Sequence, residues 1–314
     1  MKKLTDNTSL GKLILLCNVV VLVLFIISML FLMKFDKTNS AVIQERNHYN
    51  KLYEEYAMAQ HPMKQDSAEV AYYQYKLDTL QQKTGATKDE RQALAESIEV
   101  TKQTLADKKK QQADNLAKLA ELEKEYGPVQ QNWEQLNADN DAAKKKFWVM
   151  AWITIIAFLI KTVVFAMWGA RNNKNLHEIA PWMASGMKPW MSYVAWFAPI
   201  YNLIKPLSFF KEVWNETDYV LENAGVTPRD ENKVDNSNIY MSIWWGFLLI
   251  SVWLMNFVLY NTFFREGAFY VKANHGTMVV IAIVFMVITM CLETFLVQQY
   301  NKKNKMLLDN ESKF

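Results

Sequence analysis

The chain alternates between long apolar stretches and polar segments. Four of the apolar stretches are longer than an ordinary buried helix needs, and they carry almost no charge. About 20 apolar residues in a helix cross a hydrocarbon core of roughly 30 Å, and only a helix satisfies its own backbone hydrogen bonds there. The pattern therefore predicts four transmembrane helices, at 13–33, 147–168, 239–264 and 276–298.

Aromatic residues gather near the ends of the second and third of these stretches, as in the aromatic belts that mark membrane–water interfaces. A large soluble protein with buried helices is the alternative, and the exclusion of charge from the same stretches argues against it. The mean hydropathy of −0.11 reflects a polar insert that dilutes the spans. The aromatic residues concerned are Trp148, Trp152, Trp168, Trp244, Trp245, Phe263 and Phe264.

The polar insert, residues 37–146, is rich in Ala, Glu, Lys, Gln and Leu, which favour helix. Thr84-Gly85-Ala86-Thr87 predicts a turn, and Thr87 with Glu90 matches a capping box at the start of a returning helix. We therefore expect an antiparallel helical hairpin, a coiled-coil-like stalk outside the membrane, with arms at 37–83 and 87–146. Its base would continue into the first two transmembrane helices.

Two features are expected to weaken this hairpin, a proline in each arm and a thin apolar seam between the arms. His61-Pro62 and Gly127-Pro128 are expected to break or bend the two arms at comparable heights, as one joint. So thin a seam makes a two-helix hairpin marginal by itself, which favours engagement of a protein partner or of further copies of the chain. A stiff solvated spacer is the alternative. The seam consists of Val70, Tyr73, Leu77 and Leu80 opposite Leu94, Ile98, Thr101 and Leu105.

The segment 189–210 begins with sixteen uncharged residues, 189–204, which are too few for an easy crossing and include Pro199. Pro199 cannot donate a backbone hydrogen bond and frees the carbonyl of Ala195, which is tolerated at membrane depth only where protein or a watered cavity covers it. We predict a re-entrant or interfacial helix pair hinged near Pro199, with Asn202 capping the second helix or satisfying freed groups. A fifth full span is the alternative.

Basic residues predict the orientation. With four spans, the N-terminus, the segment after the second span and the C-terminus share one side, and their Lys and Arg residues make that side cytoplasmic. Lys144-Lys145-Lys146 lies on the other side and opposes this assignment. We expect a bacterial inner-membrane protein with an uncleaved signal anchor, cytoplasmic termini and an extracytoplasmic stalk. Its parts would be 1–36 (tail and first span), 37–146 (stalk) and 147–314 (membrane domain and cytoplasmic tail).

Two charged residues interrupt the apolar spans. Lys161 and Glu293 would reach similar depth, because both helices run in the same direction. An isolated charge there costs at least about 2.5 kcal/mol on insertion scales, so we predict a Lys161–Glu293 contact that fixes the register of the helices. The alternatives are snorkelling of both side chains toward the interface and a proton or ion relay.

Candidate chemistry is sparse. Cys17 and Cys291 both lie inside spans and are expected to be free thiols. The four histidines show no metal-ligand spacing, and the sequence has no Gly-rich phosphate loop, G-x-S-x-G or H-E-x-x-H motif. The formal net charge of +3 argues against nucleic acid as a partner. We expect no cofactor, no metal and no catalytic site.

A spaced motif resembles a family. Its residues are Arg171-Asn172, then Trp196-Phe197-x-Pro199-x-x-Asn202-x-x-x-Pro206, then Glu212-Val213-Trp214, and Trp244-Trp245 at the next span. This run is similar to that of a bacterial family of multi-pass membrane domains of unknown function. The resemblance covers about 147–298, with the first span as an expected first helix. It implies no activity, and the long helical insert departs from the family's usual short connection.

These observations favour a non-enzymatic membrane scaffold or coupling subunit of a larger envelope complex. The stalk would engage a protein partner or another copy of the chain, and the membrane lipid would hold the rest. The alternative is a transport or channel component, with the Pro199 segment and Lys161/Glu293 near a polar path. An enzyme acting on lipid is a third, less favoured hypothesis.

Overall fold

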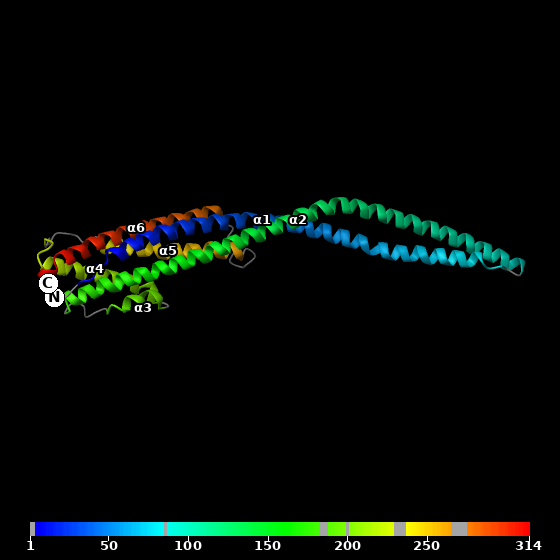
Figure 1. Cartoon of the computed structure of the whole chain (residues 1–314). Helices are drawn as coiled ribbons and strands as arrows, with labels where there is room; N and C mark the ends of the chain where they lie inside the picture. Colours follow the sequence, from blue (N-terminus) through cyan, green and yellow to red (C-terminus); the bar gives the residue numbers. More distant parts are fainter. Residues whose placement is uncertain (1–3, 85–86, 182–187, 199–200, 229–236, 265–274) are drawn as a thin grey trace. The chain divides into compact units, whose positions relative to one another are not determined.

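The computed structural model describes residues 4–84, 87–181, 188–198, 201–228, 237–264 and 275–314. These residues are almost entirely helical and include no strand, which confirms the predicted all-α class. The elements are α1 (Thr8–Gln81), α2 (Lys88–Ile179), α3 (Met191–Phe197), η1 (Tyr201–Leu203), α4 (Lys205–Asn223), α5 (Ser237–Phe263), α6 (His275–Asp309) and η2 (Glu311–Lys313) (Figure 1).

Four helices among the described residues, α1, α2, α5 and α6, are long and apolar enough to cross a membrane. In the most apolar 18-residue window of each, only 22–39% of the residues are buried inside the protein. Side chains that are apolar and yet face outward are what a bundle surrounded by lipid requires. The chain is therefore an all-α integral membrane protein, as the hydropathy pattern predicts.

The chain divides into two compact units. The membrane unit contains Met1–Asp36 and Ala143–Phe314, and the stalk contains Lys37–Ala142. Both α1 and α2 contribute residues to the two units without a helix break. Within the membrane unit, α5 packs along α6, and α4 contacts both of them.

Two apolar clusters hold the membrane unit together. One is rich in aromatic residues and joins α1, α2, α4, α5 and α6, with Trp168 and Trp244 fully buried. The other joins α1, α2, α5 and α6 and includes Phe35, which stacks on Phe263 at 5.3 Å. Near the first cluster α1 approaches α6 closely, since a Cβ on Gly11 would lie 2.0 Å from the Asn301 amide nitrogen.

α6 continues eleven residues beyond the predicted end of the last span, to Asp309. The segment 299–309 was assigned to a polar tail because of its lysines. Three of its side chains are nevertheless buried against the rest of the membrane unit, and this burial extends the helix. These are Tyr300, Asn304 and Leu307.

The stalk is an antiparallel pair of helical arms, as predicted. Thr38 donates to Asn140 at 3.0 Å, and farther along Lys109 donates to Gln74 at 3.4 Å. Midway, the buried Asp66 carboxylate accepts hydrogen bonds from Gln111 (3.1 Å) and Asn115 (2.6 Å). Polar contacts therefore hold the middle of the stalk where the apolar seam is thin.

The predicted capping box is confirmed. The Thr87 amide donates to Glu90 Oε2 at 2.9 Å, and the Glu90 amide donates to Thr87 Oγ1 at 3.3 Å. Two amides at the start of α2 that lack helical partners are satisfied in this way. Gly85 and Ala86 of the predicted turn lie outside the described residues.

Of the two outcomes expected at the prolines, a break is wrong, and a bend stays a prediction. α1 runs through Pro62 and α2 runs through Gly127-Pro128 without interruption. Proline removes one hydrogen bond and frees the carbonyl four residues earlier, at Met58 and Lys124. Both of these residues are exposed, so water can hydrate the freed groups while the remaining helical bonds persist.

The two prolines also do not face each other. Pro62 lies beside Asn115 on the opposite arm, whereas Tyr126, two residues before Pro128, stacks on Tyr56 at 4.7 Å. The two sites are thus at different heights, and the idea of one shared joint is wrong.

An aromatic stack in the stalk gives a pH prediction. The hydrogen bond with Tyr49, together with burial, raises the pKa of Tyr126 to about 12. The folded stalk therefore favours neutral Tyr126, and this stabilisation is complete below a pH of about 10 and is lost as the pH rises through 12. Absorbance titration of the full chain should show Tyr126 ionising later than the exposed tyrosines, and Tyr126→Phe should remove the step near pH 12. If the wild-type and Tyr126→Phe proteins give the same titration curve above about pH 11, the late step does not belong to Tyr126.

Candidate functional site

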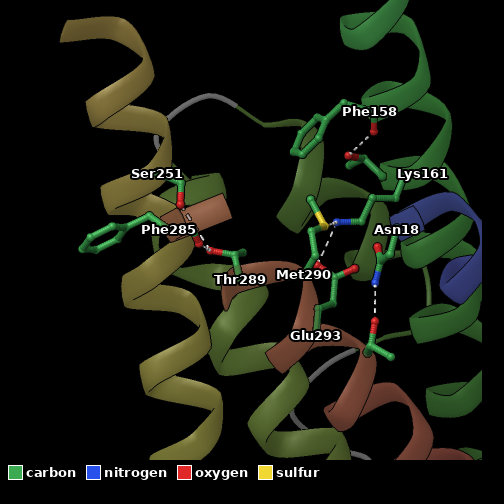
Figure 2. Close-up of polar contacts among 10 residues, drawn as sticks. Asn18, Phe158, Lys161, Ser251, Phe285, Thr289, Met290 and Glu293 are labelled. Atoms are coloured by element: carbon green, nitrogen blue, oxygen red, sulfur yellow. Dashed lines mark hydrogen bonds and ion pairs between the residues drawn. The ribbon is translucent and has the colours of Figure 1, made fainter. Parts of the chain in front are cut away.

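The intramembrane ion pair is the first candidate site, and the predicted contact is present. Lys161 Nζ on α2 lies 2.8 Å from Glu293 Oε2 on α6 and 3.5 Å from the sulfur of Met290 (Figure 2). The two charged side chains are 5% and 3% exposed. Both therefore end inside the bundle, and neither snorkels to a surface.

Around the ion pair, further polar contacts each connect two of the transmembrane helices. Asn18 on α1 donates to Thr294 on α6 at 3.2 Å, and Ser251 on α5 shares a 3.2 Å hydrogen bond with Thr289 on α6 (Figure 2). A third contact between hydroxyls, Ser28 with Thr154 at 2.8 Å, joins α1 to α2. Every transmembrane helix thus makes at least one polar contact with another.

The pair is built to hold helices together. Removing one partner of a buried pair leaves an uncompensated charge, whereas the intact pair is electrically neutral. Glu293 Oε1 and Asn18 Oδ1 are buried and make no hydrogen bond among the described residues, so each retains the capacity to accept one from an enclosed water. The described part of the chain holds no group of three His, Cys, Asp or Glu that could bind a metal ion.

Two asparagines on α5 each donate a hydrogen bond to a carbonyl of their own helix. Asn256 donates to Val252 O at 3.0 Å, and Asn261 donates to Phe257 O at 2.9 Å, each within α5. An asparagine side chain can return to the carbonyl four residues earlier, and this local contact competes with a partner helix.

The motif residues form the second candidate site, and the tryptophans of the motif lie in the buried aromatic cluster or pack against it, whereas Phe197 is exposed. Trp196 packs edge-on against Phe165 (5.2 Å) and Trp245 (5.8 Å). Trp245 in turn donates its indole N–H to the Leu203 carbonyl at 2.8 Å. The tryptophans therefore hold α3 and η1 against α2 and α5.

Trp214 ties α4 to α6. It packs against Tyr300 at 5.7 Å, and the Lys303 ammonium lies 4.3 Å above its ring while forming an ion pair with Asp218. Pro206 is buried in the first turn of α4, where a missing N–H costs nothing. The motif thus serves to pack an amphipathic helix onto the spans.

The interrupted segment is resolved into three short parts, α3, η1 and α4. Neither α3 nor α4 is among the four candidate spans, which argues against the fifth-span alternative. Pro199 lies outside the described residues. The first alternative for Asn202, a cap on the second helix, is wrong, because Asn202 is exposed and Ile204 occupies the N-cap of α4 without any side-chain cap. The second alternative, that Asn202 satisfies groups freed by Pro199, stays a prediction.

Asn172 of the motif belongs to a buried asparagine cluster that sequence reasoning missed. Its Oδ1 accepts from Asn7 Nδ2 at 2.6 Å, while Asn175 pairs with both the amide (3.0 Å) and the carbonyl (2.8 Å) of Thr5. The Leu4 amide donates to Glu311 Oε1 at 3.1 Å. The start of the chain is thereby fastened to the ends of α2 and α6. The neighbouring Arg171 is exposed.

Glu212, the acidic motif residue, lies half-buried on α4 beside a second carboxyl. Burial raises the pKa of Glu212, although the charges of Lys205 and His177 oppose the shift. Burial, and then the charge of Glu212, raise the pKa of Glu216 to about 7. Glu216 therefore changes its charge near neutral pH.

Fold and site together define a multi-pass helical membrane domain with an aromatic core. A family described as "Domain of unknown function (DUF4328)" matches residues 136–302, more than half of the chain, and the protein belongs to this family. The match includes the motif and three spans, and leaves α1 and most of the stalk outside it. No curated protein and no solved structure matches the chain.

A double-mutant cycle measures the coupling free energy between Lys161 and Glu293. Lys161→Met and Glu293→Gln should each destabilise the protein by about 3–5 kcal/mol, because each strands a buried charge. The double variant should cost clearly less than the sum of the two. Denaturant unfolding in detergent, followed by tryptophan fluorescence, gives the three values. Additive costs would mean that the two groups do not depend on each other.

Glu216 provides a pH-dependent test on α4. Its raised pKa means that the folded state disfavours ionisation, so stability should fall as pH rises from about 4.5 through 7. Glu216→Gln should therefore raise the unfolding temperature at pH 8 and leave it unchanged at pH 4. Asn215→Gln, at an exposed neighbour, is the control. An equal effect at both pH values would refute the role of burial.

Proposed function

We propose that the protein is a non-enzymatic scaffold or coupling subunit of a bacterial envelope complex, whose stalk binds a protein partner. The membrane unit anchors the chain, and the stalk presents the binding surface. Each of the helices α1 and α2 contributes residues to both units.

The observation that carries this proposal is the apolar surface of the stalk. Among its described residues, more large apolar side chains are exposed than buried, the reverse of what a self-sufficient helix pair requires. Exposed apolar surface outside the membrane marks a protein-binding site. The exposed residues are Ile43, Tyr53, Met58, Tyr72, Tyr75, Val100 and Leu116; the buried ones are Leu52, Leu77, Leu105 and Tyr126.

A groove beside Pro62 is the best-formed part of this surface. It has a volume of about 300 Å³ and runs between the arms from Glu55 and Met58 to Lys118 and Leu122. Met58, at its rim, is 71% exposed. An open, mixed groove of this size suits an inserted apolar side chain with polar contacts around it.

We further propose that the termini are cytoplasmic and the stalk is extracytoplasmic. The contact of Leu4 with Glu311 brings both ends of the chain together, in agreement with an even number of spans. Lysines near both ends, and Arg171 at the same end of α2 as Asn172, support the cytoplasmic assignment.

Charge substitutions on the stalk surface test the proposal. Met58→Glu with Leu116→Glu should lower partner recovery more than tenfold, since buried apolar anchors dominate interface energies. Both side chains are exposed, so the stalk should fold normally. Recovery is measured by affinity purification of the full chain from membranes and quantitative mass spectrometry.

The matched control is Gln81→Glu with Gln103→Glu, which adds the same two charges at exposed polar positions of the stalk. It should leave recovery unchanged. If the set and amounts of recovered proteins are the same for wild type, test and control, with equal unfolding temperatures, the stalk is not a partner-binding surface.

A further inference from the structure

One face of α5 turns a polar side chain toward lipid. In the apolar parts of the four spans, residues 13–33, 147–168, 243–260 and 278–297, the exposed side chains are aliphatic or aromatic, or the thiol of Cys291. Asn256 is the exception. It lies seven residues before the end of α5, roughly 10 Å along the helix, and an asparagine side chain is much shorter than that distance.

The Asn256 amide is only partly satisfied within the chain. One N–H of Nδ2 donates to Val252 O. The second N–H and the carbonyl Oδ1 face outward, and hydrocarbon offers neither a donor nor an acceptor. Whatever covers this face must therefore supply both.

The residues around Asn256 form a continuous seam with the spacing of a helix pair. Gly246, Leu249, Trp253, Asn256 and Tyr260 follow one another at intervals of three and four residues. An apolar seam with an average period of 3.5 residues packs parallel helices into a left-handed pair. Trp253, in the middle of the seam, is 63% exposed.

Gly246 gives the seam a point of close approach. A Cβ built at Gly246 would meet no atom of the chain within 4 Å, so this glycine faces open space. Small residues at such positions let the backbones of two transmembrane helices come near each other.

We propose that a second copy of this chain covers the seam, so that the α5 helices of two protomers pair in the membrane. Copies of one chain insert in the same direction, and a two-fold axis along the membrane normal places each seam residue against its counterpart. The amide of asparagine has equal donor and acceptor capacity, so two Asn256 side chains satisfy each other. This pairing is independent of the proposed partner of the stalk.

The test uses two seam substitutions in the full chain, reconstituted in lipid vesicles, with association followed by energy transfer between labelled copies. Asn256→Leu removes the hydrogen bonds, and Gly246→Leu fills the close approach. Each should weaken association, by roughly threefold to thirtyfold for the asparagine. Gly246→Leu adds bulk into open space within the protomer, so it should fold normally.

The controls are Ile243→Leu on α5 and Val284→Leu on α6, which change exposed residues outside the seam and should leave association unchanged. Three results would overturn the proposal. These are a monomeric wild type at every protein-to-lipid ratio, association that neither seam substitution weakens, and equal weakening by the control substitutions.

Discussion

The absence of water from the hydrocarbon core is the constraint on which the structure depends. Four helices satisfy their own backbones there, and the polar side chains between them must find partners in the protein. Lys161 and Glu293 neutralise each other at 2.8 Å, while hydroxyl and amide contacts connect the remaining helices. The bundle is thus defined by a few polar contacts that lipid cannot replace.

In the stalk, water can form hydrogen bonds with exposed polar groups. The stalk tolerates Pro62 and Pro128 within unbroken helices because solvent can hydrate the freed carbonyls. Its middle is held by the Asp66 carboxylate and two amides instead of leucines. Such a pair leaves apolar side chains on its outside, and this surplus supports a role in binding.

The sequence was most informative where a single physical requirement dominates. Apolar length predicted the four spans, equal depth predicted the Lys161–Glu293 contact, and the Thr87–Glu90 spacing predicted the capping box. Most other contacts between distant segments could not be predicted. The fastening of Asn7 and Thr5 by Asn172 and Asn175 depends on tertiary geometry, and the run of asparagines after Arg171 was its one visible signal. The prediction that the helices break at the prolines was wrong, because the helix propensity of one residue does not take account of the hydrogen bonds along the rest of a long helix.

The central claim is that one chain carries its termini on one face of a membrane and its stalk on the other. Labelling by a membrane-impermeant thiol reagent tests it most directly, with single cysteines at Gln103 and at Ser312 in a chain whose Cys17 and Cys291 are alanine. In intact cells with a permeable outer layer, the account predicts labelling at Gln103 and protection at Ser312, and labelling of both after lysis. Equal labelling of the two positions before lysis, or the reverse pattern, would contradict it.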